Sequence, residues 1–253
     1  MPVNQNAISP VDGWLARFGR VLLPTRCLVC GEAGFDGHDL CVDCQRALPW
    51  NRSACAHCGL PMPVLSTDEG PEPVAACGRC LKKPPPLDRV HAIFRYGFPV
   101  DRLLPRFKFH HDLAAGRELA DAMRAMLVEA MSIDSERPQA LIAVPLHPKR
   151  LRLRGYNQAL ELAKPLSKAF AIPLLHDGLR RIRDIAPQIG LGALARRRNP
   201  RGAFALGNDA LPAYVALIDD VMTTGATLHE CARVLKRAGV LRVDAWVAAR
   251  VPR

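Results

Sequence analysis

The chain has 253 residues, 49% of them hydrophobic, and a formal net charge of +11. This length predicts one or two globular domains with a sizeable core, and the absence of any run near about 18 apolar residues excludes a membrane-spanning helix. The positive charge favours anionic partners such as nucleotides, diphosphates or nucleic acid, and it does not choose among them.

Residues 1–25 predict a polar tail with a short amphipathic helix, because apolar side chains between Trp14 and Leu22 fall at helical spacing. The chain does not begin with basic residues followed by an apolar stretch, so no secretory signal is expected. The protein is therefore expected to be cytoplasmic. A membrane-surface role for the helix is disfavoured, since only Arg17 and Arg20 supply positive charge.

Four Cys-x2-Cys pairs dominate the next segment, residues 26–84. The first two pairs are separated by ten residues and the last two by eighteen. In a chain without a signal sequence this pattern predicts zinc rather than disulfides, because each pair forms a tight turn that directs two sulfurs at one metal. The predicted zinc ligands are Cys27, Cys30, Cys41, Cys44, Cys55, Cys58, Cys77 and Cys80.

Two structural Zn²⁺ ions are therefore expected, each held by four cysteines. Sequential pairing of the four turns makes a double zinc ribbon, and interleaved pairing is the alternative. Such sites have no open coordination position, so they are expected to fold the segment and to perform no chemistry.

A spacer with three consecutive prolines follows Lys83 and marks a domain boundary at residue 84. The second domain, residues 85–253, opens with an alternating apolar pattern over 89–96 that predicts a strand. Two helices are expected next, the first over 101–109 and the second after an N-cap at Asp112.

A buried strand is predicted over 139–144, followed by a loop and by a helix over 157–170. The loop carries four basic residues within 149–154. Because it follows the carboxyl end of a strand, where arginine can bind phosphate through two hydrogen bonds, the loop is expected to bind an anion. A solvated cationic surface is the alternative.

Residues 180–201 contain seven arginines and one acid. Pro187, Gly190 and Gly192 favour an irregular segment, which is expected to close over the site as a lid. The alternative is an arm that binds nucleic acid. Base stacking on this segment is not supported, because Phe204 is the only aromatic residue close to it.

The most informative stretch is residues 215–228. Four apolar residues predict a short buried strand, Asp219 and Asp220 follow it, and helical spacing begins after Thr227 and stops at Gly239. The loop places backbone N–H groups and hydroxyls at a helix N-terminus, where partial positive charge favours a phosphate. The two acids suit ribose hydroxyls, with Mg²⁺ to offset their charge. A final strand is predicted over 243–247.

Over about fourteen positions this stretch resembles the phosphoribosyl-diphosphate (PRPP) motif of type I phosphoribosyltransferases. That motif is an apolar run, two acids, two apolar residues and then Thr-Thr-Gly-Ala-Thr. The resemblance implies an α/β fold, with a parallel sheet flanked by helices, and PRPP with Mg²⁺ as ligands. The residues that it assigns to PRPP binding are Asp219, Asp220, Val221, Thr223, Thr224, Gly225, Ala226 and Thr227.

The order of motifs along residues 26–250 resembles the ComF family of phosphoribosyltransferase-like proteins, which includes the GntX-type members. That order is double zinc ribbon, Lys-Pro-Pro-Pro, Phe-Lys-Phe, Val-Pro-Leu-His, Arg-Gly-Tyr-Asn-Gln and the PRPP loop. The resemblance implies a link with natural transformation and DNA uptake, through single-stranded DNA and other competence proteins. It also implies a diphosphate loop and hood comprising Pro145, Leu146, His147, Arg150, Arg154, Arg183, Gln188, Arg196 and Arg198.

Two functions therefore compete. In the first, the chain is a phosphoribosyltransferase with four candidate catalytic residues: Asp219 and Asp220 hold the ribose, and Arg150 and Arg154 stabilise the departing diphosphate. No residue stands out as a general base, and the acceptor is not specified. In the second, the chain is a non-catalytic, zinc-stabilised protein that binds single-stranded DNA or acts as a scaffold of the competence machinery.

Overall fold

The computed structural model describes residues 25–67, 70–73, 76–133, 136–183 and 201–252. The chain forms two compact units, one ending at Ala47 and one beginning at Leu48. The helix expected between Trp14 and Leu22 lies outside the described residues. The domain boundary at residue 84 stays a prediction.

The first unit contains the first two cysteine pairs and one short helix, α2 (Val42–Arg46). Its opening turn is closed by backbone hydrogen bonds, since the Gly31 N–H donates to the Cys27 carbonyl at 2.9 Å and the Cys27 N–H donates to the Glu32 carbonyl at 2.7 Å. Gly31 has a φ of 83°, which residues with a Cβ rarely adopt. These bonds shape the turn that presents Cys27 and Cys30.

The second unit begins with the other two cysteine pairs. Between them lies a small antiparallel hairpin of β1 (Val64–Thr67) and β2 (Gly70–Pro73). The short helix α3 (Gly78–Lys82) starts directly after Cys77 and contains Cys80. The second ribbon therefore belongs to the same compact unit as the sheet that follows it in the chain.

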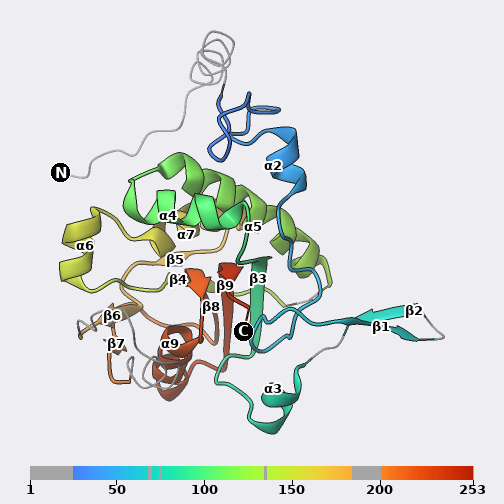
Figure 1. Ribbon diagram of the computed structural model, residues 1–253. Helices are drawn as coiled ribbons and strands as arrows, with labels where there is room; N and C mark the ends of the chain where they lie inside the picture. Colours follow the sequence, from blue (N-terminus) through green and yellow to red (C-terminus); the bar gives the residue numbers. More distant parts are fainter. Residues whose placement is uncertain (1–24, 68–69, 74–75, 134–135, 184–200, 253) are drawn as a thin grey trace. The chain divides into compact units, whose positions relative to one another are not determined.

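Five parallel strands form the main sheet of the second unit, which confirms the predicted α/β class (Figure 1). Their order is β3-β9-β8-β4-β5, and each neighbouring pair is parallel. The strands are β3 (Arg89–Arg95), β4 (Ala140–Ala143), β5 (Leu174–Leu175), β8 (Tyr214–Met222) and β9 (Arg242–Arg250). Because parallel strands need long crossovers, helices separate most of them in the sequence.

One face of the sheet is covered by α9 (Ala226–Arg237). Leu228 and Cys231 of this helix share a core cluster with Val215 and Leu217 of β8, which are alternate residues of one strand and so point to one face. A second antiparallel hairpin packs beside α9, and its strands are β6 (Leu179–Arg181) and β7 (Phe204–Leu206).

The opposite face is covered by three helices: α4 (Val100–Phe109), α5 (Leu113–Ile133) and α7 (Gln158–Phe170). Phe170 of α7 contacts Trp246 of β9, with ring centroids 5.8 Å apart. Asp112 caps α5 as predicted, because its Oδ1 accepts the N–H groups of Ala114 and Ala115. None of the helices in the described part of the chain has the length and apolar character needed to cross a membrane.

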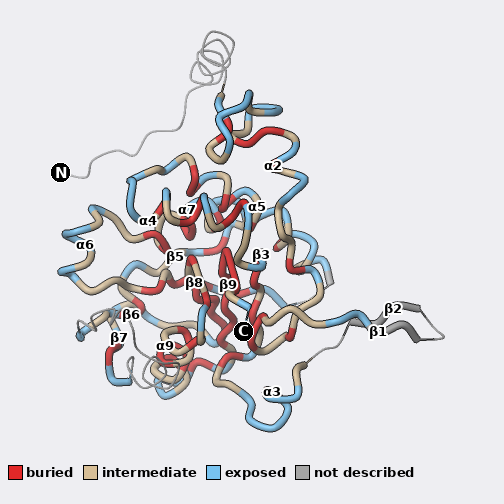
Figure 2. Tube along the Cα trace, viewed as in Figure 1, coloured by how far each residue is buried: buried red, intermediate tan, exposed pale blue. Residues whose placement is uncertain are grey.

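The two central strands are buried on both faces (Figure 2). β9 is buried from Val243 to Arg250, and β8 is buried from Tyr214 to Ile218. Strands with helices on both sides are expected to be apolar throughout rather than alternating. The continuous apolar runs in this half of the sequence therefore follow from the layer arrangement.

The predicted end of β8 was wrong by several residues. The apolar run ends at Ile218, but the strand continues through both acids to Met222, where it still pairs with Arg250 of β9. The reason is that β9 itself is three residues longer than its predicted end at Val247, so it offers backbone partners to the acids.

The predicted cationic loop over 145–154 was also wrong in part, because α6 (Pro148–Arg154) occupies most of it. His147 is the N-cap and its side chain accepts the Lys149 N–H at 3.3 Å, while Pro148 fits the first helical turn. Gly155 ends the helix with a φ of 73°. None of its residues is buried, so the apolar periodicity that would have revealed it is absent.

Candidate functional site

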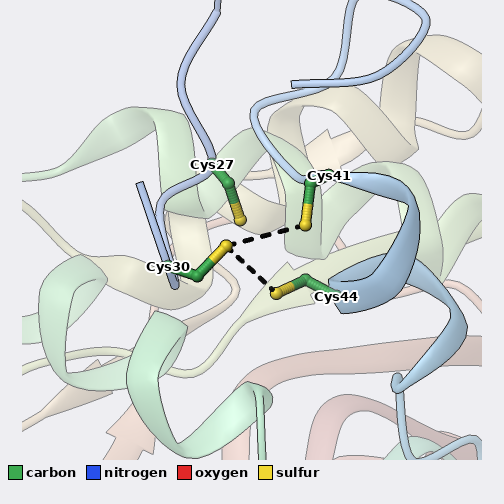
Figure 3. A group of neighbouring side chains, drawn as sticks. All are labelled: Cys27, Cys30, Cys41 and Cys44. Carbon is green, nitrogen blue, oxygen red and sulfur yellow. Dashed lines mark hydrogen bonds between the residues drawn. The ribbon is translucent and has the colours of Figure 1, made fainter. Parts of the chain in front are cut away.

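The first four cysteines converge from two turns (Figure 3). The sulfurs of Cys27, Cys30, Cys41 and Cys44 all lie within 4.8 Å of one another, and Cys30 Sγ is 3.6 Å from Cys41 Sγ and 3.8 Å from Cys44 Sγ. Tetrahedral zinc with bonds of about 2.3 Å places its sulfurs about 3.8 Å apart. The residues present therefore fit a structural Zn²⁺ ion.

The other four cysteines form a second cluster of the same kind, made of Cys55, Cys58, Cys77 and Cys80. Cys58 Sγ lies 3.8 Å from Cys77 Sγ, and the Cys77 N–H donates to Cys55 Sγ at 3.3 Å, as backbone amides do toward metal-bound thiolates. All these cysteines are free of disulfides. The grouping is sequential, as expected, and not interleaved.

Hydrogen bonds join the second ribbon to β3, the edge strand of the main sheet. The buried Asn51 side chain donates from Nδ2 to the carbonyls of Gly59 at 3.0 Å and Ala92 at 3.1 Å. The Val90 N–H also donates to the Ala56 carbonyl at 2.7 Å. These bonds satisfy backbone groups of the edge strand β3, which would otherwise offer an open pairing edge.

Residues 223–225 lie between β8 and α9, and residues 226–227 open the helix. This stretch is the one that the sequence predicts to bind a phosphate, and it is called the phosphate loop below. Gly225 has a φ of 78°, and a Cβ there would lie 2.5 Å from Met222 Cε and 3.1 Å from the His229 ring. The Ala226 N–H donates to Thr224 Oγ1 at 3.4 Å, and the N–H groups of the first turn of α9 have no partner within the helix, as at anion-binding helix N-termini. Glycine is therefore required at this position for both conformation and space.

Asp219 and Asp220 lie on opposite faces of the sheet, because they are successive residues of β8. Asp220 is 8% exposed and its Oδ2 lies 3.0 Å from Nζ of Lys108, which comes from α4 on the second helical layer. Asp219 lies on the α9 face and its Oδ1 accepts the Asp220 N–H at 2.9 Å.

The two carboxyl groups have different electrostatic surroundings. Desolvation and the negative charge of Asp220 raise the pKa of Asp219 to about 7, while Lys108 and Arg181 act in the opposite direction. Asp219 therefore exchanges a proton near neutral pH, and the Asp220 carboxylate is held by a lysine ammonium group.

The loop lies at the point where the chain changes direction across the sheet. From β4 the chain passes through α7 to β5, whereas from β8 it passes through α9 to β9 on the other side. The carboxyl ends of β4 and β8 are neighbours, since the Val144 N–H donates to the Ile218 carbonyl at 2.9 Å. Open α/β sheets bind ligands in the crevice at such a position.

The predicted diphosphate residues divide into two groups. Pro145, Leu146 and His147 follow β4 and so lie at the same sheet edge as the phosphate loop. Arg154 is held elsewhere, since it donates to Gln158 Oε1 at 3.1 Å and its guanidinium lies 5.3 Å from the centre of the Phe109 ring.

The remaining predicted residues lie on α6 or in the hood. Arg150 is a partly exposed residue of α6, and Arg183 is exposed just after β6. Gln188, Arg196 and Arg198 lie outside the described residues, so their predicted roles stay predictions.

Two residues of this region were missed from the sequence. Lys108 was visible only as the centre of the Phe-Lys-Phe motif, and nothing local paired it with Asp220. Arg250 is 0% exposed, and its Nε donates to the Cys58 carbonyl at 2.7 Å. Its Nη1 donates to the carbonyls of Met222, at 2.9 Å, and Thr223.

Arg250 therefore joins the second zinc turn to the first residues of the phosphate loop. Burial lowers the pKa of its guanidinium below the usual value, and the neighbouring thiols of the zinc cluster oppose that change. The sequence around Arg250 does not predict that it links these two segments, because its hydrogen-bond partners are 28 and 192 positions away in the chain.

Comparisons with known proteins agree with this arrangement. A family model described as "Double zinc ribbon domain" matches residues 18–87. "Competence protein F" of Haemophilus influenzae is 35% identical over 230 residues, which are 89% of this chain and 96% of that protein. "DNA utilization protein YhgH" of Escherichia coli strain K12 is 32% identical over 234 residues, 90% of this chain and 98% of that protein.

A more distant relative, "Competence protein ComFC" of Bacillus subtilis, is 28% identical over 151 residues, 58% of each chain. The similarity to the first two relatives extends over nearly the whole of both proteins, so it includes the zinc ribbon as well as the sheet. The N-terminal part of the chain is a double zinc ribbon with two four-cysteine clusters, and the chain therefore belongs to the ComF family.

Proposed function

We propose that this protein binds PRPP with Mg²⁺ at the phosphate loop. The observation that carries the proposal is the placement of two acids directly before a loop at a helix N-terminus, where the sheet changes direction. The 5′-phosphate would accept hydrogen bonds from the N–H groups and hydroxyls of residues 223–227. The ribose hydroxyls would donate to Asp219 and Asp220, with Lys108 and Mg²⁺ balancing the negative charge.

The diphosphate of the same ligand would lie toward the end of β4. Backbone groups of residues 145–147 are close to it in this arrangement, and Arg150 follows them on the partly exposed helix α6. Arg154 is less well suited, because its guanidinium is already bonded to Gln158 and lies over Phe109.

We further propose phosphoribosyl transfer as the reaction that such a complex supports. An acceptor nucleophile would form a bond to the anomeric carbon, and the bond from that carbon to the diphosphate oxygen would break with its electron pair leaving on the diphosphate. Cations near the leaving group stabilise the charge that develops there. The acceptor is left open.

The biological setting that we propose is the uptake or use of DNA. The relatives named "Competence protein F" and "DNA utilization protein YhgH" support this setting, because they match nearly the full chain. Single-stranded DNA and other competence proteins are accordingly the proposed partners, with the nucleotide pocket controlling how DNA is handled.

Calorimetric titration of the zinc-loaded full chain with PRPP and Mg²⁺ tests the ligand. We expect micromolar binding by the natural protein and at least about tenfold weaker binding by Asp220→Ala, which loses a ribose contact. Asp121→Ala, which removes an exposed acid from α5, is the matched control and keeps full affinity. Absence of binding by the natural protein would overturn the proposal.

A second candidate function is the binding of a DNA strand by the arginines of residues 180–201, supported by their density and by the names of the relatives. Arg196→Ala combined with Arg198→Ala is expected to weaken binding of a single-stranded oligonucleotide and to reduce its salt dependence. Asp220→Ala is expected to leave that binding unchanged. Equal affinity of the double variant and the natural protein would remove this segment as the DNA site.

A further inference from the structure

A pocket of about 310 Å³ lies between the second zinc ribbon, the proline spacer and α9. Its lining includes Thr224 and Ala226 of the phosphate loop and continues along α9 as far as Arg233. Its other walls come from α3 and from the chain just before β7. The side chains that matter most are Arg79, Lys83, Arg201, His229, Glu230 and Arg233.

The side chains that line the pocket include four cations and one acid. Its single acid, Glu230, is already engaged by Arg233 and by the Gly202 N–H, which donates to Oε1 at 2.9 Å. Arg79, Lys83 and Arg201 are exposed, and none of the three forms an ion pair within the described part of the chain.

The zinc cluster does not cancel this charge. Zinc with four thiolates leaves a net charge of about −2 at the pocket wall, formed by Cys58 and Cys80. The buried Arg250 guanidinium lies against the same cluster, where its Nε binds the Cys58 carbonyl. Cations therefore still outnumber the negative charges around the pocket.

His229 adds a polar group without adding charge. The residue lines the pocket, while its Nε2 is buried on the side of the ring that lies against Gly225 and has no hydrogen-bond partner among the described residues. Burial and the neighbouring arginines lower the pKa of His229 to about 4, so the ring is neutral at pH 7. Burying a ring nitrogen without a hydrogen-bond partner costs free energy, unless a water molecule forms a hydrogen bond with it.

The spacer supplies the apolar wall. Pro84, Pro85 and Pro86 line the pocket, and the next residue, Leu87, is 1% exposed in the main core, so the spacer is anchored against the domain. Proline rings offer a rigid apolar surface and no N–H donor. A ligand that fits this lining has both an anionic group and a flat apolar group.

We infer that this pocket binds a mononucleotide. Its phosphate lies against Arg79, Lys83 and Arg201, and its base lies on the proline rings. The volume is at the lower end of that found for small-molecule sites, which suits one nucleotide and not a longer strand. The site adjoins the phosphate loop, with which it shares Thr224 and Ala226, and its lining does not include Asp219 or Asp220.

Calorimetric titration of the zinc-loaded full chain with AMP tests this site. The test variant combines Lys83→Gln with Arg201→Gln, and the matched control is Lys82→Gln, an equally exposed lysine one residue earlier that does not line the pocket. We expect AMP to bind the natural protein, the control and Asp220→Ala alike. The double variant is expected to bind at least about tenfold more weakly, because two charge-assisted contacts are lost.

Three outcomes of these titrations would overturn the inference. Loss of AMP binding in Asp220→Ala would place the nucleotide at the phosphate loop and overturn the inference, as would equal losses in Lys82→Gln and the double variant. Failure of AMP to bind the natural protein would also overturn it. All the substituted cations are exposed, and a thermal melt of each variant checks that it is folded.

Discussion

Asp219 and Asp220 are neighbours in the chain, but the sheet sends them to opposite sides. Asp220 meets Lys108 from the helical layer over one face, at 3.0 Å. Asp219 lies on the face of the sheet that α9 covers, and the pKa of its carboxyl group is raised. Two adjacent acids can therefore act differently toward one ligand, since only one of them has a lysine partner.

This difference predicts a pH dependence of PRPP binding. The pKa of Asp219 is raised to about 7, so the group is mostly protonated at pH 6 and mostly ionised at pH 8. Because the ionised form is the one that accepts ribose hydroxyls and favours Mg²⁺, affinity should rise by up to about tenfold over this range. Calorimetry at several pH values measures the rise.

The control for that experiment is Asp219→Asn, which removes the titrating group and keeps its size. Its remaining pH dependence reports the ligand's own phosphates. The natural protein's stability should change in the opposite sense to binding: the native pKa lies above the ordinary value of 3.8, so this group's contribution falls as pH rises from about 4 to about 7. An identical pH profile in both proteins would show that Asp219 does not titrate in this range.

At the scale of elements, the β8–loop–α9 unit was predictable because its signals are local. An apolar run, a glycine and a change of period all fall within 25 residues. The end of β8 was not predictable, since its last residues are held by pairing with β9 rather than by their own character. The helix α6 was not predicted because none of its residues is buried, so its sequence lacks the periodic apolar positions of a helix that packs on a core.

Two glycines of this unit provide a matched pair of tests. Gly225 and Gly239 both have positive φ angles, 78° and 96°, so alanine at either position should cost about 1–2 kcal/mol of stability from backbone strain. Only at Gly225 would the added Cβ also collide, 2.5 Å from Met222 Cε, while Gly239 faces open space. Gly225→Ala should therefore lose more stability and should lose PRPP binding.

Denaturant unfolding and calorimetric titration of the two variants measure these effects. Gly239→Ala is expected to bind PRPP as the natural protein does, because the end of α9 is far along the helix from the loop. If both variants lost the same stability and kept the same affinity, close packing around Gly225 would not be what shapes the loop.

At the scale of the whole molecule, the two zinc clusters have different surroundings. The first lies in the unit that ends at Ala47, and the second lies in the unit that contains the sheet. The second is joined to the phosphate loop by the buried Arg250, which donates to the Cys58 carbonyl and to the carbonyls of Met222 and Thr223. Zinc at the second cluster should therefore stabilise the loop.

Cys58→Ser and Cys30→Ser test that difference. Each should lower the zinc content by up to one ion, because each removes one ligand of a four-cysteine site. Cys58→Ser should also increase amide hydrogen exchange in residues 222–227 and weaken PRPP binding, whereas Cys30→Ser should change neither. Equal effects of the two variants on the loop would show that Arg250 does not transmit the state of the second cluster.

The cysteines of both clusters and the strand–loop–helix unit of residues 215–239 were predictable from residue types at short spacings, where the chain's own geometry leaves little choice. The parallel sheet was expected from the resemblance to the phosphoribosyltransferases, and the structure confirms this sheet. Only the tertiary structure decided that Lys108 neutralises Asp220, that Arg250 links a zinc turn to the loop and that the proline spacer lines a pocket. Those contacts join segments up to 192 residues apart, and no local pattern encodes a partner that folding alone brings near.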